Sequence, residues 1–163
     1  MNIVLLEPEI PYNTGNVGRT CVTTNTPLHL IKPLGFSLDE KHLKRSGLDY
    51  WKDIDLHVYD NYQEFLEYNN FPTVIMATTK ARKRYSDIAF KGDEFIMFGK
   101  ETAGIPERLL TDNKEHCIRI PMVSGTRSVN LSNAVAIVLF EALRQQDFYG
   151  LECAGQLHQS TWD

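Results

Sequence analysis

Residues 120–133 read IPMVSGTRSVNLSN, and this stretch says more about the fold than any other part of the chain. Two further segments are similar in composition: residues 13–20 (NTGNVGRT) and residues 98–106 (FGKETAGIP). Each segment follows a short apolar run typical of a buried strand, and each is rich in small polar residues and glycine. Open α/β sheets bind their ligands beyond the carboxyl ends of their strands. We therefore expect the three segments to form one composite binding site.

Strand-like and helix-like segments alternate along the chain. We expect strands over residues 3–6, 28–31, 56–59, 73–77, 94–98 and 117–120, and helices over residues 14–25, 38–46, 62–68 and 130–146, with a further short helix that Pro106 opens. Short apolar strands alternating with helices predict an α/β fold, a mainly parallel sheet with helices on both faces. The 163 residues are close to the usual length of one domain. We expect a single domain over residues 1–163, in which residues 150–163 form a loosely ordered tail.

The composition argues against several classes of protein. With 42% hydrophobic residues the chain can bury a core, and nothing in it indicates disorder. The three cysteines, Cys21, Cys117 and Cys153, lack CxxC spacing, which argues against a disulfide framework or zinc site and fits a reducing cytosol. No apolar run approaches the ~20 residues that span a bilayer, and the N-terminus lacks the basic region of a signal peptide. We therefore expect a cytoplasmic protein that uses neither a membrane nor a metal ion.

The first two segments each allow a functional and a structural interpretation. The first places Asn16 and Arg19 near the start of a helix, with Asn13 or Thr14 as its N-cap. A helix N-terminus attracts anions and the guanidinium of Arg19 matches phosphate, although an ordinary capped helix with a surface arginine is the alternative. In the second segment, Glu101 could accept hydrogen bonds from ligand hydroxyls or could simply fix a tight strand-to-helix turn.

The third segment offers more small polar groups than helix capping needs. Ser128 and Asn130 can cap the long helix, and the surrounding hydroxyl, amide and backbone donors suit a polar ligand. The net charge of −4 is unfavourable for nucleic-acid binding, so an RNA partner would have to meet a local basic patch. The densest basic run, which is either a solvated loop or a set of contacts to RNA phosphates, consists of Lys80, Arg82, Lys83 and Arg84.

Three other kinds of site lack their sequence signatures. The GxGxxG and GxxxxGK[ST] motifs are absent, so a dinucleotide site or a P-loop has no phosphate cradle. GxSxG is absent as well, which leaves hydrolase chemistry unsupported. The five histidines are scattered without the spacing of metal ligands.

Taken together, the three segments resemble the three motifs of the SPOUT superfamily, the trefoil-knotted methyltransferases. The resemblance runs from Asn2 to about Tyr149 and is closest to the minimal single-domain branch, the tRNA wobble-nucleotide (cytidine/uridine) 2′-O-methyltransferases. Residues 7–11 (EPEIP), 33–36 (PLGF) and 47–50 (GLDY) also match that branch. The chain differs at Lys100, where relatives often have proline, and at residues 124–127 (SGTR), where they often have Pro-Asp-Ser-Arg.

The resemblance implies a fold, a cofactor and a partner. The fold is a deep trefoil knot formed by the C-terminal half, the cofactor is S-adenosyl-L-methionine bent in the knotted loops, and the partner is the anticodon stem-loop of a tRNA. The family also works as a homodimer whose active site lies close to the subunit interface. The cofactor-binding candidates that follow are Ala77, Gly99, Glu101, Ile120, Ser128, Asn130 and Leu131. The catalytic candidates, both in the first segment, are Arg19 and Asn16.

The implied reaction transfers a methyl group to a ribose 2′-hydroxyl, and alignment of the reacting atoms can supply much of the acceleration. Because a guanidinium is effectively always protonated, we expect Arg19 to clamp the target phosphate and stabilise the developing alkoxide rather than to act as the base. Two other classes stay open: a non-catalytic knotted RNA-binding or assembly module, and another nucleotide-dependent α/β enzyme. A test for cofactor binding separates the first class from the methyltransferase, and a thermal-shift comparison of NAD with S-adenosylhomocysteine separates the second.

The long helix also indicates a homodimer on its own pattern. Val129, Ile137 and Phe140 make it apolar over more than one stripe. Since one sheet covers only one stripe of a helix, we expect the rest to pack on a second subunit, together with part of the first helix.

Overall fold

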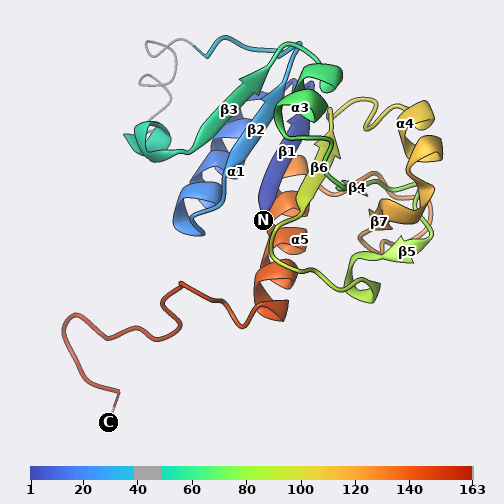
Figure 1. The fold of residues 1–163 in the computed structure, drawn as a ribbon. Coiled ribbons are helices and arrows are strands. Elements are labelled where there is room, and N and C mark those ends of the chain that lie inside the picture. Colours follow the sequence, from blue (N-terminus) through green and yellow to red (C-terminus); the bar gives the residue numbers. More distant parts are fainter. Residues whose placement is uncertain (39–48, 163) are drawn as a thin grey trace.

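The computed structural model describes residues 1–38 and 49–162, so the helix predicted over residues 38–46 lies almost entirely outside the described residues. The described strands form one sheet (Figure 1) and are β1 (Asn2–Leu6), β2 (Leu28–Ile31), β3 (Leu56–Tyr59), β4 (Val74–Ala77), β5 (Lys83–Arg84), β6 (Phe95–Gly99) and β7 (Cys117–Arg119). Their order in the sheet is β3-β2-β1-β6-β4-β7-β5, and every pairing between these strands is parallel. The predicted α/β fold is confirmed. The strand order is consistent with the deep trefoil knot, which itself stays a prediction.

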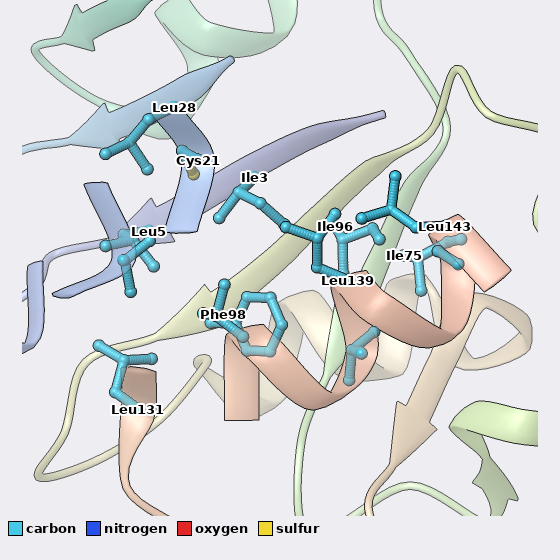
Figure 2. Packing of buried hydrophobic residues seen from close by; sticks show 14 of the residues in the cluster. Ile3, Leu5, Cys21, Leu28, Ile75, Ile96, Phe98, Leu131, Leu139 and Leu143 are labelled. Carbon is cyan, nitrogen blue, oxygen red and sulfur yellow. The ribbon is translucent and has the colours of Figure 1, made fainter. Parts of the chain in front are cut away.

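The first face of the sheet is covered by the two longest described helices, α1 (Pro11–Thr23) and α5 (Leu131–Gln145). Side chains alternate along a strand, so Ile3 and Leu5 of β1 point to this face. Figure 2 shows Leu139 and Leu143 of α5 packed beside the strand side chains, and all of these residues are at most 7% exposed. This layer forms the larger of the two cores.

The opposite face is covered by two shorter helices, α3 (Tyr62–Tyr68) and α4 (Glu107–Asp112). Val4 of β1 points to this side, where Phe65 of α3 and Leu110 of α4 complete the packing. The prediction of helices on both faces is therefore confirmed. Three 3₁₀ helices join the described elements: η1 (Asp49–Asp53), η2 (Tyr85–Asp87) and η3 (Lys114–His116).

The predicted limits of helix α1 are wrong. The helix begins at Pro11, three residues before the predicted start at Thr14, and it ends at Thr23 with Ile10 as its N-cap. Proline suits the first turn of a helix because backbone N–H groups there have no hydrogen-bond partner within the helix, so the missing N–H of proline costs no hydrogen bond. As a result Asn13 and Thr14 do not cap the helix; both are buried within it.

Helix α5 begins where the third segment predicts. Asn130 is its N-cap, and its side-chain oxygen accepts hydrogen bonds from the backbone N–H groups of Ser132 and Asn133. Ser128, the other predicted cap, lies two residues before the cap and is exposed. The helix therefore owes its start to Asn130 alone.

The basic run differs from the predicted solvated loop. Lys83 and Arg84 form the short edge strand β5, which pairs with Ile118 and Arg119 of β7. Two positive side chains on an edge strand discourage pairing with another chain, which is how natural sheets protect their edges. Elsewhere the predicted strand and helix limits differ from the observed ones by one residue or not at all.

The C-terminal residues 151–162 form neither helix nor strand. Figure 1 shows this tail running away from the body of the protein. Leu151 is half-buried against the first core, and the residues after it are exposed. The loose order of the tail and the single-domain organisation over residues 1–163 stay predictions.

A buried histidine lies under helix α3. His29 of β2 is 3% exposed, with its Nδ1 2.9 Å from the Tyr59 hydroxyl and its Nε2 3.3 Å from Oδ1 of Asn2. Its ring stacks on the ring of His57 at a centroid distance of 4.7 Å. Burial, with a smaller contribution from the positive charge of His57, lowers the pKa of His29 to about 4, although Asp55 opposes the shift.

This histidine makes the stability of the fold depend on pH. Because the folded-state pKa lies below the ordinary histidine value of 6.5, the unfolded chain binds more protons between the two values. The contribution of His29 to the free energy of unfolding is therefore fully present above pH 6.5. It is lost as the pH drops toward 4, which lowers stability by up to about 3 kcal/mol. Urea unfolding at a series of pH values measures the loss. A His29→Gln variant that loses stability just as steeply over this interval would contradict the assignment.

Candidate functional site

A cavity of about 380 Å³ opens where the carboxyl ends of four neighbouring strands meet. It is lined by residues that follow β1, β6, β4 and β7 and by the first turn of α5, and all three polar segments contribute to it. Its volume lies within the ~300–1,000 Å³ of typical small-molecule sites. Because the sheet is parallel, segments far apart in the sequence converge at one edge, where α/β proteins bind ligands.

The residues carried over as cofactor-binding candidates all line this cavity. They come from the ends of β4, β6 and β7 and from the start of α5, and they are Ala77, Gly99, Glu101, Ile120, Ser128, Asn130 and Leu131. The apolar part of the wall includes Phe98, Ile105 and Ala134. The role of each residue toward a ligand stays a prediction.

A chain of hydrogen bonds joins the three segments. The Glu101 carboxylate accepts from the side-chain amide of Asn13 at 2.9 Å, and the side-chain oxygen of Asn13 accepts from Asn130 at 2.9 Å. Asn130 in turn caps α5 and accepts from the Ser132 hydroxyl at 2.7 Å. We call Glu101, Asn13 and Asn130 the polar relay. It fixes the second and third segments to the first turns of α1 and α5.

Glu101 also binds the backbone just before the first segment. Its two carboxylate oxygens accept from the backbone N–H groups of Glu9 at 2.8 Å and of Ile10 at 3.2 Å. These contacts favour the interpretation in which Glu101 fixes the turn. Sequence reasoning treated Asn13 only as a possible N-cap and missed its place in the relay. The sequence did contain a feature that pointed to this residue, because Asn13 is the first residue of the first polar segment.

Further contacts hold the second segment against the chain after β1. The Lys100 ammonium donates to a Glu7 carboxylate oxygen at 2.7 Å, and this hydrogen bond raises the pKa of Lys100. The Glu9 carboxylate accepts from the Thr102 hydroxyl at 2.9 Å and from its backbone N–H at 3.0 Å. The Thr102 hydroxyl bond is the main cause of the lowered pKa of Glu9. The cavity wall is thus built on a loop with several anchors.

Gly99 is required by the turn itself. A Cβ atom at this position would lie 2.2 Å from the carbonyl carbon of Gly104 and 2.3 Å from the backbone nitrogen of Ile105. Gly104 has a φ of +69° and closes the turn through a 2.8 Å hydrogen bond to the Lys100 carbonyl. Any side chain at Gly99 would therefore disrupt the loop before it could fill the cavity.

The two catalytic candidates lie elsewhere. Asn16 and Arg19 are on the exposed side of α1, and neither lines the cavity. The buried side of the helix carries Asn13, Val17 and Cys21 instead. Within one subunit the structure therefore brings together the predicted cofactor residues but not the predicted catalytic pair.

The four residues of the basic run also separate. Lys80 lines the cavity and pairs with Glu107 at 2.8 Å. Lys83 pairs with Glu115 at 3.1 Å, and Arg84 pairs with Asp87 at 2.7 Å. No ion pair of Arg82 is found among residues 1–38 and 49–162.

Two of the predictions, no metal site and no membrane span, concern features that residues 1–38 and 49–162 could carry. In that part of the chain, no cluster of three or more His, Cys, Asp and Glu side chains is arranged to hold a metal ion. None of the helices described is both long and apolar enough to cross a bilayer.

Comparison with known proteins identifies the class that this fold and site define. Residues 1–140 match the SpoU rRNA Methylase family, and the chain belongs to that family. Two relatives are the tRNA (cytidine(34)-2′-O)-methyltransferases of Methylovorus glucosotrophus and Escherichia coli, 47% and 45% identical over 150 and 151 residues. The aligned regions cover 91% and 92% of this chain and 97% and 96% of the relatives.

Solved structures agree with this family. One of them, from work on the 2′-OH methylation of C/U34 on tRNA, is 39% identical in sequence and superposes with a TM-score of 0.83. The aligned region covers 90% of this chain and 96% of that protein's chain. A SpoU methyltransferase from Streptomyces viridochromogenes, solved with AdoMet, covers 90% of this chain and 58% of its own with a TM-score of 0.75. At 20% identity this last structure shows a shared fold alone.

Proposed function

We propose that this protein is a tRNA 2′-O-methyltransferase that uses S-adenosyl-L-methionine and modifies the wobble nucleotide, a cytidine or a modified uridine, in an anticodon stem-loop. The observation that carries the proposal is the cavity at the strand ends to which all three polar segments contribute. It occurs in a chain that aligns over more than nine-tenths of its length with relatives named for this reaction at cytidine 34. A tRNA substrate also supports a cytoplasmic location.

The residues of the cavity suit a nucleoside that carries a polar tail. Phe98, Ile105, Ile120 and Leu131 offer an apolar surface for a base, and the backbone around Gly99 and Ser128 offers donors and acceptors. Ala77, Gly99, Ile120, Ser128 and Leu131 would hold the cofactor, while Glu101 and Asn130 hold the surrounding loops in place. When bound there, S-adenosylmethionine supplies a methyl group already activated on a sulfonium. The chain itself must orient the ribose, exclude water and stabilise charge.

A homodimer would bring the catalytic pair to the cavity. Tyr12 on α1 is 75% exposed, and Phe140 and Ile137 on α5 are 46% and 36% exposed. An apolar surface of this kind across two neighbouring helices favours a second copy of the chain as its partner. In such a dimer, Arg19 and Asn16 of one subunit serve the cavity of the other, where Arg19 clamps a phosphate and stabilises the developing alkoxide.

Ligand-induced stabilisation tests cofactor binding directly. S-adenosylhomocysteine at about 100 times its Kd should stabilise the fold by roughly 2.7 kcal/mol, or roughly 5–10 °C in Tm. Ala134→Leu should abolish the shift, because Ala134 lines the cavity from the first turns of α5. Ala136→Leu places the same side chain on the same helix outside the cavity lining and should keep the shift. A wild-type Tm that does not respond would contradict the proposal, and a response to NAD instead would indicate another nucleotide-dependent enzyme.

The reaction is tested by incubating the protein with S-adenosylmethionine and tRNA and analysing the nucleosides by mass spectrometry. The expected product carries one added methyl on the ribose of nucleotide 34. A protein that binds the cofactor and tRNA but forms no methylated nucleoside would instead be a non-catalytic module.

A further inference from the structure

A second cavity, of about 460 Å³, lies directly beside the first and shares Thr78 and Lys80 with it. One side is formed by the segment that leaves β4 and enters β5, and the other by the end of α4 and by η3. Figure 1 shows β5, β7 and α4 together at one end of the sheet. A ligand that extends out of the first cavity past Lys80 would enter the second.

The second cavity is strongly basic in an otherwise acidic chain. Lys80, Arg82, Lys83 and Lys114 line it, and Glu115 is the one carboxylate among its lining residues. The chain as a whole has a net charge of −4. Lys114 lies thirty residues beyond the basic run and reaches this site because β5 and β4 both pair with β7, which follows η3. Sequence spacing alone could not have grouped it with the others.

The cations of this cavity remain available for an anionic ligand. The Lys80–Glu107 and Lys83–Glu115 pairs are exposed, with Glu107 and Glu115 side chains 78% and 70% accessible. Exposed pairs of this kind contribute only about 0–1 kcal/mol, so a phosphate can replace either carboxylate at little cost. No ion pair of Arg82 or Lys114 occurs within the described ranges. Arg84, by contrast, is paired with Asp87 and does not line the cavity.

We propose that this basic cavity binds a backbone phosphate of the tRNA next to the ribose that is methylated. The proposal rests on the proposed function, because it assumes that the target nucleotide lies at the mouth of the first cavity, next to the bound cofactor. Every internal ribose of an RNA chain has a phosphate on each side, so a nucleotide bound there brings a phosphate close to the neighbouring cavity. Contacts to phosphate set position and register without reading the base. The cavity thus positions the target nucleotide, with Lys114 and Arg82 as its principal contacts.

A charge-matched pair of variants tests this assignment. Arg82→Gln with Lys114→Gln removes two positive charges from the cavity, and Lys91→Glu changes the net charge by the same amount on a loop that lines neither cavity. The double variant should bind tRNA roughly tenfold more weakly than the Lys91→Glu protein at equal salt. The slope of log Kd against log salt concentration should fall by about 0.7, the value for one single-stranded phosphate contact. The Tm shift with S-adenosylhomocysteine should stay at the control value, because neither Arg82 nor Lys114 lines the first cavity.

The outcomes separate this inference from the proposed function. If wild-type protein methylates tRNA but the double variant binds it as tightly as the Lys91→Glu control, the phosphate site is overturned while the function stands. If wild-type protein methylates no tRNA, the proposed function fails by itself. Inorganic phosphate, titrated at constant ionic strength, distinguishes the source of the anion. Micromolar binding of free phosphate that the double variant loses, without a change in tRNA affinity, would also overturn the assignment to RNA.

Discussion

Replacing Glu101 by Gln should lower the single-turnover rate of methyl transfer by roughly a hundredfold while the protein still folds. The Glu101 carboxylate accepts hydrogen bonds from the Asn13 amide and from the backbone N–H groups of Glu9 and Ile10. The amide of Gln can accept at one atom only, so at least one of these donors loses its partner. The polar relay then no longer fixes the loops around the cavity, and a displacement of ~1 Å at reacting atoms can cost about a hundredfold in rate.

The control for this change is Glu9→Gln. The Glu9 carboxylate holds the same loop through Thr102 but lies outside both the relay and the cavity lining. We expect this variant to keep its rate within a few-fold of wild type. Single-turnover kinetics with saturating tRNA and cofactor, together with the Tm of each variant, makes the comparison. Equal rates for Glu101→Gln and wild type would show that the relay serves the fold alone.

Much of the fold could be predicted because the local signals agree with the tertiary structure. The strand over residues 28–31 is apolar at three of its four positions and matches β2 residue for residue, and all four residues are buried, as expected of a parallel strand covered on both faces. The start of α1 was mispredicted because polar residues at Asn13 and Thr14 resemble a cap. In the structure both residues are buried within α1, and the helix begins two residues earlier than Asn13, with Pro11 in its first turn.

The candidate site was predictable only in part. The segments at the carboxyl ends of strands could be assigned to one site because parallel topology brings such ends together. Arg84 pairs locally with Asp87, three residues further on, but the pairing of Lys80 with Glu107 and of Lys83 with Glu115 depends on which distant segments the fold brings together. Sequence spacing carries no information about such partners. The same reason explains why Lys114 was missed and why Arg19 lies outside the cavity of its own chain.

The location of Arg19 determines what the proposed dimer must look like for Arg19 to act on a substrate. Asn13 lines the cavity, and Arg19 follows it by six residues on the same helix. Helical geometry places it ~9 Å further along the axis and about 120° around it. An arginine that is exposed on α1 beside an apolar surface on α5 can act on a reacting nucleotide if the second subunit supplies the cavity. Arg19→Ala should then lower the saturated rate by at least a hundredfold and leave the Tm shift with S-adenosylhomocysteine unchanged.

Mixing two inactive variants decides whether Arg19 acts across the interface. In a heterodimer of Arg19→Ala and Glu101→Gln subunits, one cavity combines an intact relay with an intact Arg19 from its partner. Random exchange gives half heterodimers, each with one working site, so the mixture should recover about a quarter of the wild-type rate. Mixing Arg19→Ala with the double variant Arg19→Ala, Glu101→Gln supplies no Arg19 and should recover nothing. As a control, light scattering must show dimers, and affinity-tagged subunits must show that the subunits have exchanged. If exchanged dimers recover no activity, Arg19 acts within its own subunit and the trans arrangement is wrong.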